Sequence, residues 1–278
     1  MGVFTSSLVP AQQKNQSMFA DAQAYDRFMG RWSKLAAPLL VDFAGISDGG
    51  HVLDVGSGTG SLALSIVERM PRCHVTGIDP SSEYITYAQS QTRSDRIRFQ
   101  TGDAQEMAFG NGAFDHSLSL LVFNFIPDPK KALLEIRRVT KSGGCIAAAV
   151  WDYGQDMRML RLFWDAAIAL DPAAEKLDEK HMPLCRSGEL SHLWQQAALD
   201  RIEERPLDIA MTFASFRDFW DPFLLGQGPA GAYVAQLPRD RRQSLAEEVK
   251  RRLMLAGDSA PFTLRGRIWA VRGMVPNG

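Results

Sequence analysis

The stretch Asp54-Val55-Gly56-Ser57-Gly58-Thr59-Gly60 decides the fold of this chain. It closes a short β-branched run at residues 51–55 and precedes an apolar stripe at helical spacing within residues 62–67. Glycines in such a turn let a ligand lie directly against the backbone. The free N–H groups of the following helix then point at that ligand. The stretch therefore predicts a strand, a ligand-binding turn and a helix in succession.

The same alternation continues along the chain. Further strands are expected over 73–78, 97–99, 114–123 and 145–151. Ser81 or Ser82 can cap the helix before the third strand, and Asp128-Pro129 opens another helix over 128–139. Strands joined by helices at this spacing lie parallel, and their crossovers are right-handed. The pattern predicts an α/β, doubly wound sheet with helices on both faces.

Helical and strand patterns also flank this core. The expected elements are a helical segment over 17–45, helices over 155–170 and 188–199 with a loop over 171–186 between them, a strand over 201–213, a mostly helical stretch over 214–256 and a strand over 262–271. No repeat or flexible linker interrupts them. We therefore expect one domain over 1–278. Its parts are an N-terminal helical cap (17–48), a cofactor-binding core (50–151), a helical insertion (152–199) and the last two strands with intervening helices (200–278).

Composition and charge narrow the class of protein. Of 278 residues, 45% are hydrophobic and 23% are charged, values typical of an ordered globular chain. The 31 basic and 32 acidic residues leave a net charge of −1, without the basic surplus that nucleic-acid binding usually needs. No uncharged apolar run is long enough to span a membrane. The first residues also lack the basic start and apolar run of a secretory signal.

The cysteines and histidines give no sign of a metal or disulfide site. Cys73, Cys145 and Cys185 are far apart in sequence, so neither a disulfide framework nor a CxxC pair is expected. A reducing, cytoplasmic location is the simplest expectation for such a chain. No cluster of His, Asp and Glu has the spacing of metal ligands. We therefore expect no bound metal.

The spacing of the glycines bears on the kind of ligand. A dinucleotide site has the pattern G-x-G-x-x-G, whereas here the third glycine, Gly60, comes one residue early and Ser61 follows it. A carboxylate, Asp54, also stands two residues before Gly56. This carboxylate would repel a pyrophosphate and attract a ligand that carries an ammonium group. The turn thus favours a cationic adenosine derivative over NAD.

Two more acidic side chains follow strand ends. Asp79 closes the second strand, where a carboxylate can accept hydrogen bonds from both ribose hydroxyls. Asp103, within Gly102-Asp103-Ala104, follows the third strand and can accept a bond from an adenine amino group. A single aspartate at a strand end is most often a helix cap or a turn former. Three of them at successive carboxyl ends indicate one shared site, because ligands of open α/β sheets bind at that edge.

Together these residues resemble the class I S-adenosylmethionine-dependent methyltransferases, in particular the small-molecule and ubiquinone/menaquinone-type group. The resemblance covers about residues 50–151. Besides the three acidic positions and the glycine turn, it rests on Phe114-Asp115, on Ala132-Leu133-Leu134-Glu135-Ile136-Arg137-Arg138-Val139 and on Ser142-Gly143-Gly144. It implies a Rossmann-like, seven-stranded doubly wound sheet whose last two strands are antiparallel, with helical cap and lid insertions. It also implies S-adenosyl-L-methionine as cofactor and S-adenosyl-L-homocysteine as product.

The resemblance assigns roles to individual residues. It places Asp54, Gly56, Ser57 and Gly58 against the methionine part of the cofactor, Asp79 on the ribose, Pro80 or Ser81 beside the adenine, Gly102, Asp103 and Ala104 at the adenine ring, and Ser119 and Leu120 near the sulfonium. In the N-terminal helical segment, Tyr25 is expected to close over the ligand. Arg31 is expected to pair with the methionine carboxylate, because a guanidinium forks onto a carboxylate. Trp32 is a further candidate, and the alternative for all three is packing of an amphipathic helix.

A small, partly apolar acceptor fits the remaining signals. Methyl transfer from a sulfonium is an in-line displacement, so the protein mainly supplies alignment and a dry pocket. The segments after residue 151 are expected to supply a lid and an acceptor pocket from large apolar residues, namely Met157, Met159, Phe163, Trp164, Met182, Trp194, Met211, Phe213, Phe216, Phe219, Trp220 and Phe223. The motif of enzymes that methylate DNA-base amines is missing, because its place reads Asn124-Phe125-Ile126-Pro127. A nucleic-acid acceptor is therefore not expected.

Several alternatives stay open at this point. A catalytically silent S-adenosylmethionine-binding protein would keep the same glycine turn and acidic residues. A NAD-dependent oxidoreductase would share Asp79, and a protein could be the methyl acceptor. The general base is unassigned: His51, His74 and His116 fall in expected core strands, whereas His181 and His192 fall in the helical insertion.

Overall fold

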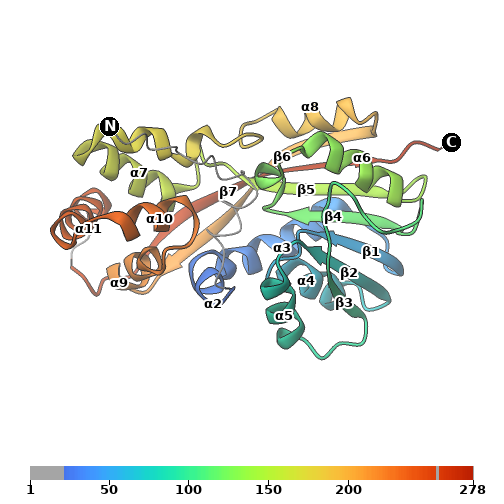
Figure 1. Cartoon of the computed structure of the whole chain (residues 1–278), viewed down its shortest axis with the longest axis horizontal. Coiled ribbons are helices and arrows are strands. Elements are labelled where there is room, and N and C mark those ends of the chain that lie inside the picture. The colour runs from blue at the N-terminus through green and yellow to red at the C-terminus, as the bar shows by residue number, and fades with distance from the viewer. Residues whose placement is uncertain (1–21, 255–256, 278) are drawn as a thin grey trace, which may run out of the picture.

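The computed structural model describes residues 22–254 and 257–277. Its centre is a seven-stranded sheet with the order β3-β2-β1-β4-β5-β7-β6 (Figure 1). The strands are β1 (Gly50–Val55), β2 (Cys73–Asp79), β3 (Ile97–Thr101), β4 (His116–Leu120), β5 (Cys145–Trp151), β6 (Asp200–Phe213) and β7 (Phe262–Met274). The first five are parallel, and β7 is antiparallel to both β5 and β6. The predicted fold class, with its antiparallel last pair, is confirmed.

Helices flank the sheet along its length. Those of the first half are α2 (Ala22–Tyr25), α3 (Arg31–Ala44), α4 (Ser61–Arg69), α5 (Ser82–Gln91) and α6 (Pro129–Val139), with a π-helical turn at Asp26–Gly30 and a 3-10 turn at Phe123–Phe125. Those of the second half are α7 (Arg158–Leu170), α8 (Glu189–Gln196), α9 (Phe216–Trp220), α10 (Gly228–Gln236) and α11 (Arg239–Leu253), with 3-10 turns at Pro172–Leu177, Glu179–His181 and Asp221–Leu225.

Local signals in the sequence set several helix ends. Ser81 caps α5, since its hydroxyl accepts a hydrogen bond from the Tyr84 amide at 3.3 Å. Asp128 caps α6 in the same way through the Lys131 amide at 2.9 Å, as the sequence predicted. At the other end of α3, Gly45 adopts a left-handed backbone with φ of 60°, a conformation that glycine reaches without steric cost.

Strand β4 is shorter than the sequence predicted. The apolar run 114–123 favours one long strand, but the strand ends at Leu120. Leu121 takes a left-handed backbone with φ of 64°, and its amide donates to the Ala149 carbonyl of β5 at 2.7 Å. The chain then turns away from the sheet through Phe123–Phe125. The apolar side chains beyond Leu120 are therefore available to line a cavity at this sheet edge.

The long strands β6 and β7 carry a second body of packed helices. Figure 1 shows α7, α9, α10 and α11 gathered around the ends of β6 and β7 that lie farthest from β1–β5. We call these four helices, the 3-10 turn at Asp221–Leu225 and the adjoining strand ends the distal lobe. Its interior is aromatic: the Phe163 and Phe223 rings stack at 4.7 Å between centroids, and both side chains are fully buried. Burial of such large apolar surfaces is the main force that holds the lobe together.

The described residues include three free cysteines and no helix that could span a membrane. No helix within 22–254 or 257–277 is long and apolar enough to cross a membrane. The expectation about a secretory signal concerns residues that lie outside these ranges. Cys73, Cys145 and Cys185 are buried and free.

Candidate functional site

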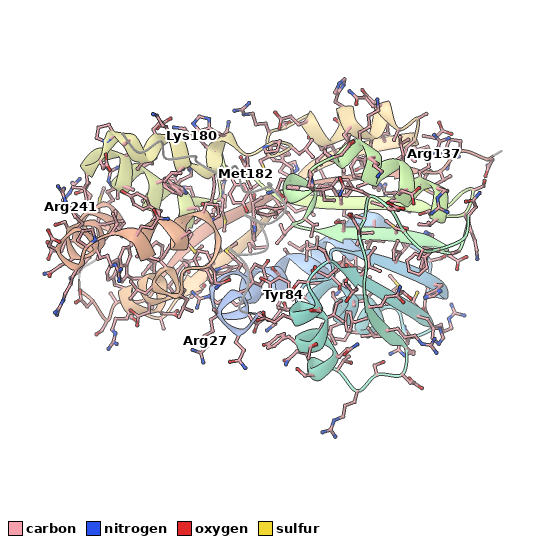
Figure 2. All side chains as sticks on the ribbon, viewed as in Figure 1. Arg27, Tyr84, Arg137, Lys180, Met182 and Arg241 are labelled. Carbon is pink, nitrogen blue, oxygen red and sulfur yellow. The ribbon has the colours of Figure 1, made fainter. Side chains whose placement is uncertain are left out.

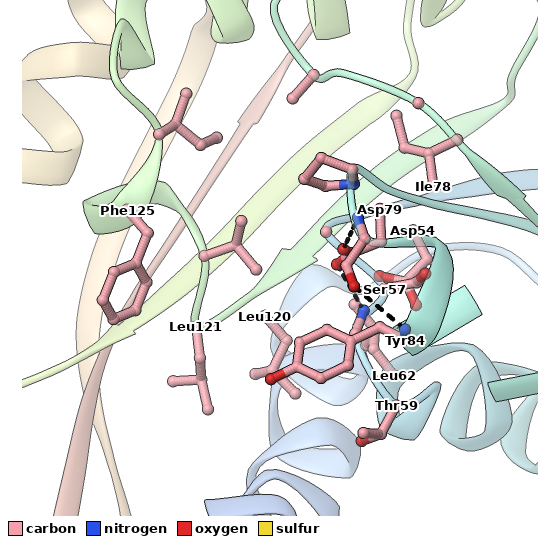
Figure 3. A pocket seen from close by; sticks show the side chains of 18 of the residues that line it. Asp54, Ser57, Thr59, Leu62, Ile78, Asp79, Tyr84, Leu120, Leu121 and Phe125 are labelled. Carbon is pink, nitrogen blue, oxygen red and sulfur yellow. Dashed lines mark hydrogen bonds between the residues drawn. The ribbon is translucent and has the colours of Figure 1, made fainter. Parts of the chain in front are cut away.

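A cavity of about 500 Å³ opens at the carboxyl ends of β1, β2, β3 and β4. Most of the predicted site residues line it, namely Tyr25, Asp54, Gly56, Ser57, Gly58, Asp79, Pro80, Ser81, Gly102, Asp103, Ala104 and Leu120. Figure 3 shows the acidic side of this cavity around Asp54 and Asp79, and its apolar side around Leu121 and Phe125. The structure thus brings together residues from five separate stretches of the chain.

The glycine turn lies tightly against its neighbours. Gly56 has φ of 71°, and a Cβ placed there would come within 2.5 Å of the Val122 side chain. The Gly58 amide donates to Asp79 Oδ2 at 3.0 Å, and the Ser81 amide donates to Asp79 Oδ1 at 2.9 Å. Asp79 therefore braces the turn. A carboxylate can accept about four hydrogen bonds, so each oxygen keeps capacity for a ligand.

Asp54 is a fully buried carboxyl group at the floor of the cavity. Its Oδ2 accepts a hydrogen bond from the Ala63 amide at 3.1 Å. Its Oδ1 has no partner among the described residues, and the same holds for the hydroxyls of Ser57 and Ser61. Burial, opposed by the hydrogen bond from the Ala63 amide and aided by the charge of Asp79, raises the pKa of Asp54 to about 8. An unpaired buried carboxyl group of this kind suits a ligand that brings a positive charge.

Aromatic and apolar side chains form the other side of the cavity. The rings of Tyr25 from α2 and Tyr84 from α5 lie 5.6 Å apart at 45°, and both line the cavity. Burial raises the pKa of the Tyr25 phenol to about 12. The turn after β4 contributes the opposite wall through Leu121, Val122, Phe125, Ile126 and Pro127. The sequence analysis did not identify these wall residues or Tyr84. The turn after β4 lies at the same sheet edge as the glycine turn, and that position could have indicated the wall residues.

Arg31 and Ser119 lie outside the cavity lining. Arg31 donates from Nη1 to Asp218 Oδ1 at 2.8 Å and from Nη2 to the Asp218 carbonyl at 3.2 Å. Its guanidinium lies 4.2 Å from the Trp32 ring centre and 4.8 Å from that of Phe213. Trp32 itself is buried and packs in the core. Ser119 is buried, and its hydroxyl donates to the Val55 carbonyl at 2.8 Å. It ties β4 to β1 behind the turn.

The expected lid residues lie in the interior of the molecule, except that Met182 is only partly buried. Most of the aromatic side chains named from the second half of the sequence pack on one another, Trp194 packs on Phe123, and none of them lines the cavity. Phe213, for example, contacts Phe219 and Phe262 with ring centres 5.2 and 5.1 Å apart. Large apolar side chains gain more by packing densely together than by lining an open cavity, which explains this placement.

The histidines and possible metal ligands are also away from the cavity. None of the five histidines lines it. His51 is within 2.8 Å of the Thr76 hydroxyl, and His116 accepts the Cys145 amide at 3.1 Å. Burial lowers the pKa of both rings. Across residues 22–254 and 257–277, no group of three or more His, Cys, Asp or Glu side chains is arranged to hold a metal ion.

Figure 2 places the labelled charged residues Arg137, Lys180 and Arg241 at the periphery, whereas Tyr84 lies toward the middle of the molecule. Tyr25 of α2 and Ser33 of α3 line the cavity together with residues at the ends of β1–β4. The cavity therefore lies between this half of the sheet and the cap formed by α2 and α3.

Comparison with known proteins shows what the core is similar to. Residues 53–148 match the family described as "Methyltransferase domain". The chain is 35% identical over 116 residues to demethylmenaquinone methyltransferase of Thermus thermophilus, an overlap of 41% of this chain and 51% of that protein. It is 32% identical over 137 residues to a sterol 24-C-methyltransferase of Gibberella zeae, an overlap of 48% of this chain and 35% of that protein. The chain thus spans about half or less of the length of these relatives.

A solved structure shares the whole architecture. Phosphoethanolamine N-methyltransferase 2 of Haemonchus contortus, in complex with S-adenosyl-L-methionine, superposes with a TM-score of 0.62 and 17% sequence identity. The match covers 99% of this chain and 62% of that chain. At this level of identity the likeness establishes the fold.

Proposed function

We propose that this chain is a class I S-adenosylmethionine-dependent methyltransferase, in keeping with the match of its core at residues 53–148, and that it transfers a methyl group from S-adenosyl-L-methionine to a small, partly apolar acceptor. The cofactor, when bound, supplies the electrophilic methyl group. The chain supplies the binding, the orientation and the exclusion of water.

The observation that carries this proposal is the state of Asp54. A fully buried carboxyl group with an unpartnered Oδ1 is costly unless a ligand provides a partner. The ammonium group of the methionine moiety is such a partner, whereas a pyrophosphate would add repulsion. The free hydroxyls of Ser57 and Ser61 beside it give further polar contacts for the same moiety. The Asp54 carboxyl group and the two serine hydroxyls therefore fit a ligand with a positively charged amino-acid group.

The remaining acidic residues suit the nucleoside half. Asp79 is proposed to accept from the ribose hydroxyls, with the Gly58 and Ser81 amides holding its carboxylate in place. The Gly102–Ala104 segment lines the cavity next to it and is proposed to hold the adenine. Asp103 is kept in position by the Gln105 amide, which donates to its Oδ1 at 2.8 Å.

The apolar wall sets the character of the proposed acceptor. Leu120, Leu121, Val122, Phe125 and Ile126 present hydrocarbon to the cavity beside the glycine turn. A dry wall favours the reaction, because the positive charge on sulfur disappears as the methyl group moves. An acceptor with an apolar body can bury that body here and hold its reacting atom in line, and alignment of this kind is a large source of acceleration.

We propose that the chain works as one unit. In it, the N-terminal cap (17–48) and the helical parts (152–199 and 200–278) surround the core at 50–151. Residues 17–21 of that cap lie outside the described ranges.

Two measurements test the proposed function. Isothermal titration should show binding of S-adenosyl-L-homocysteine and none of NADH; the reverse result would rule the proposal out. Incubation with methyl-labelled S-adenosyl-L-methionine and a cell extract should then move the label into the small-molecule fraction. Binding without any transfer of label would instead identify a silent cofactor-binding protein, and label in protein or nucleic acid would contradict the small acceptor.

A further inference from the structure

The segment after β3 reaches across the cavity to the segment after β4. In the sheet, β2 and β1 lie between β3 and β4, so the ends of β3 and β4 are roughly 14 Å apart at the usual spacing of neighbouring strands. Gln105 helps to span this gap: its Oε1 accepts a hydrogen bond from the Asp128 backbone amide, just before α6, at 3.1 Å. The bond uses only the backbone of Asp128. Gln105 thus links the lining segment Gly102–Gln105 with the one that ends at Pro127.

The same side chain also holds the Asp103 carboxylate. The Gln105 backbone amide donates to Asp103 Oδ1 at 2.8 Å, and the side-chain Nε2 donates to Oδ1 at 3.1 Å and to Oδ2 at 3.3 Å. The backbone bond alone would leave the carboxylate free to turn, because the terminal torsion of an aspartate has broad energy minima. Since Nε2 contacts both oxygens, it fixes the plane of the carboxylate.

The orientation of the Gln105 amide group follows from its two partners. Its NH2 group faces the Asp103 carboxylate, which accepts hydrogen bonds, and its oxygen faces the Asp128 N–H, which donates one. The flipped amide would place oxygen against oxygen on one side and N–H against N–H on the other. A single arrangement is therefore favoured, and in it the Asp128 amide holds Gln105 while Gln105 holds Asp103.

Asp103 keeps capacity for a ligand. It lines the cavity together with Ala104 and Gln105. A carboxylate can accept about four hydrogen bonds, and within the described part of the chain its Oδ2 accepts only the longer bond from Gln105. The carboxylate is thus fixed in orientation and has an open acceptor position.

We propose that Gln105 is a positioning residue that aims the Asp103 carboxylate at the amino group of the cofactor's adenine and so sets the selectivity for adenine over hypoxanthine. The adenine amino group donates to a carboxylate oxygen, whereas hypoxanthine carries a carbonyl oxygen at the same place, and two acceptors repel each other. Gln105 itself needs no contact with the ligand. This inference rests on the proposed function, because it takes Asp103 as the residue that meets the adenine.

The ratio of two affinities separates aiming from a purely structural tie. A tie that only holds the two segments together would, when lost, weaken the binding of both nucleosides equally. Isothermal titration therefore compares S-adenosyl-L-homocysteine with its deaminated analogue, S-inosyl-L-homocysteine. The wild-type protein is expected to prefer the adenosyl compound at least about tenfold, the factor that one hydrogen bond to a charged group gives.

Two variants set the range of the effect. Asp103→Ala removes the acceptor and should bring the two affinities close together. Gln105→Leu keeps the backbone bond to Asp103 and removes both side-chain bonds, so it should lower the preference at least about threefold. An unchanged preference in Asp103→Ala or in Gln105→Leu would overturn the proposal.

Two further variants serve as matched controls. Gln105→Glu keeps an acceptor for the Asp128 amide but loses the donor to Asp103, so at about pH 8, where both carboxylates are ionised, it should lose the preference as Gln105→Leu does. A preference that Gln105→Glu retains would mean that the bond to Asp128 carries the effect, which contradicts the aiming role. Gln89→Ala removes another side-chain tie, from Nε2 to the Phe99 carbonyl of β3 at 3.1 Å, away from the cavity lining, and should keep the full preference.

Failure of this inference differs from failure of the proposed function. Wild-type protein that binds S-adenosyl-L-homocysteine and S-inosyl-L-homocysteine equally well would overturn the selectivity assigned to Asp103 and Gln105, while the proposed function would stand. Wild-type protein that binds neither compound would reject the proposed function, and the positioning role with it.

Discussion

Two neighbouring carboxyl groups define the acidic side of the cavity, and their surroundings give them different tasks. Asp79 has both oxygens engaged by loop amides and so holds the shape of the glycine turn. Asp54 has one oxygen bound by the Ala63 amide of α4 and the other unpaired. Asp79 thus holds the turn and keeps acceptor capacity for a ligand, whereas Asp54 has an oxygen that is free to pair with one.

Proton release on ligand binding tests the role of Asp54. Its pKa of about 8 keeps the carboxyl group mostly protonated at pH 7 in the free protein. Pairing with an ammonium group requires the ionised form, so binding of S-adenosyl-L-homocysteine at pH 7 should release close to one proton per site. Titration calorimetry in buffers of different ionisation enthalpy measures this number. Asp54→Asn should bind more weakly and release none; release by the variant equal to that of wild type would refute the pairing.

Removal of Asp79 should weaken cofactor binding strongly. Hydrogen bonds to a charged partner contribute about 1.5–3 kcal/mol each, so Asp79→Ala should raise the dissociation constant of S-adenosyl-L-homocysteine by roughly tenfold or more. Asp79→Asn keeps one acceptor for the loop amides and should lose less. Asp128→Ala removes a cap at the surface and is a suitable control, since its affinity should stay unchanged. Calorimetry that finds equal affinities for Asp79→Ala and wild type would contradict the ribose role.

For single residues, the sequence predicts the roles of those in local motifs and misses contacts between residues that are far apart in the chain. Asp54, Gly56 and Asp79 belong to short motifs at strand ends, so their meeting at one sheet edge could be predicted. Arg31 was expected to face the ligand, but its partner in the structure is Asp218, 187 residues further along the chain. No local pattern reveals such a pairing. Glu179, which sits in a segment predicted as loop, was likewise invisible as a buried carboxylate.

Among the elements, the N-terminal cap has contacts on two sides. Toward the core, the Ala22 amide donates to Glu83 of α5 at 3.2 Å, and Tyr25 lies against Tyr84. Toward the distal lobe, Phe28 meets Phe223 with ring centres 5.0 Å apart. The π-helical turn at Asp26–Gly30 joins these two contacts, and such turns are frequent at functional positions.

The ion pair between Arg31 and Asp218 should hold the cap in place. Both side chains are about one-third exposed, so the pair contributes at most about 1 kcal/mol. Asp218→Asn should therefore weaken S-adenosyl-L-homocysteine binding by up to about fivefold and speed amide hydrogen exchange within residues 22–33. Asp221→Asn, which disturbs the exposed pair with Arg217, is the matched control. An exchange rate that is unchanged in Asp218→Asn would show that the cap does not depend on this pair.

The sequence placed nearly every element, and each of the errors has an identifiable physical cause. β4 was predicted too long because its apolar run continues into the cavity wall, and periodicity alone does not distinguish a wall from a strand. The segment 171–186 was expected as loop and contains two short 3-10 turns that Asp171 and Asp178 cap. Those turns depend on a buried ion pair with α7, a tertiary contact.

For the molecule as a whole, buried carboxyl groups should make stability depend on pH. Burial raises the folded-state pKa of Asp54 to about 8 and that of Glu179 to about 7. Unfolded, both ionise near pH 4. A raised carboxyl pKa stabilises fully below the unfolded value and loses that stability as pH rises through the folded value.

The ligand-free protein should accordingly be less stable at pH 8 than at pH 6.5. The loss is up to about 1.4 kcal/mol per pH unit for each group. The half-buried His51 and His116, whose pKa partial burial lowers, act mainly at more acidic pH. Urea unfolding at several pH values measures the slope. Asp54→Asn should flatten it between pH 7 and 8; a wild-type slope of zero or of opposite sign would mean that these groups ionise freely in the folded chain.

The family match ends at residue 148, within β5, whereas the sheet continues through β7, which pairs with β5 from Cys145↔Met274 to Trp151↔Ile268. The core and the later elements thus meet along this backbone seam, and also where Phe28 packs on Phe223 and Arg31 pairs with Asp218. A hybrid protein that joins this core to another second half after Trp151 would need to keep both the register of the seam and these cap contacts. Exchange of the second half alone would leave the apolar wall at Leu121, Val122 and Phe125 in place, because that wall belongs to the core.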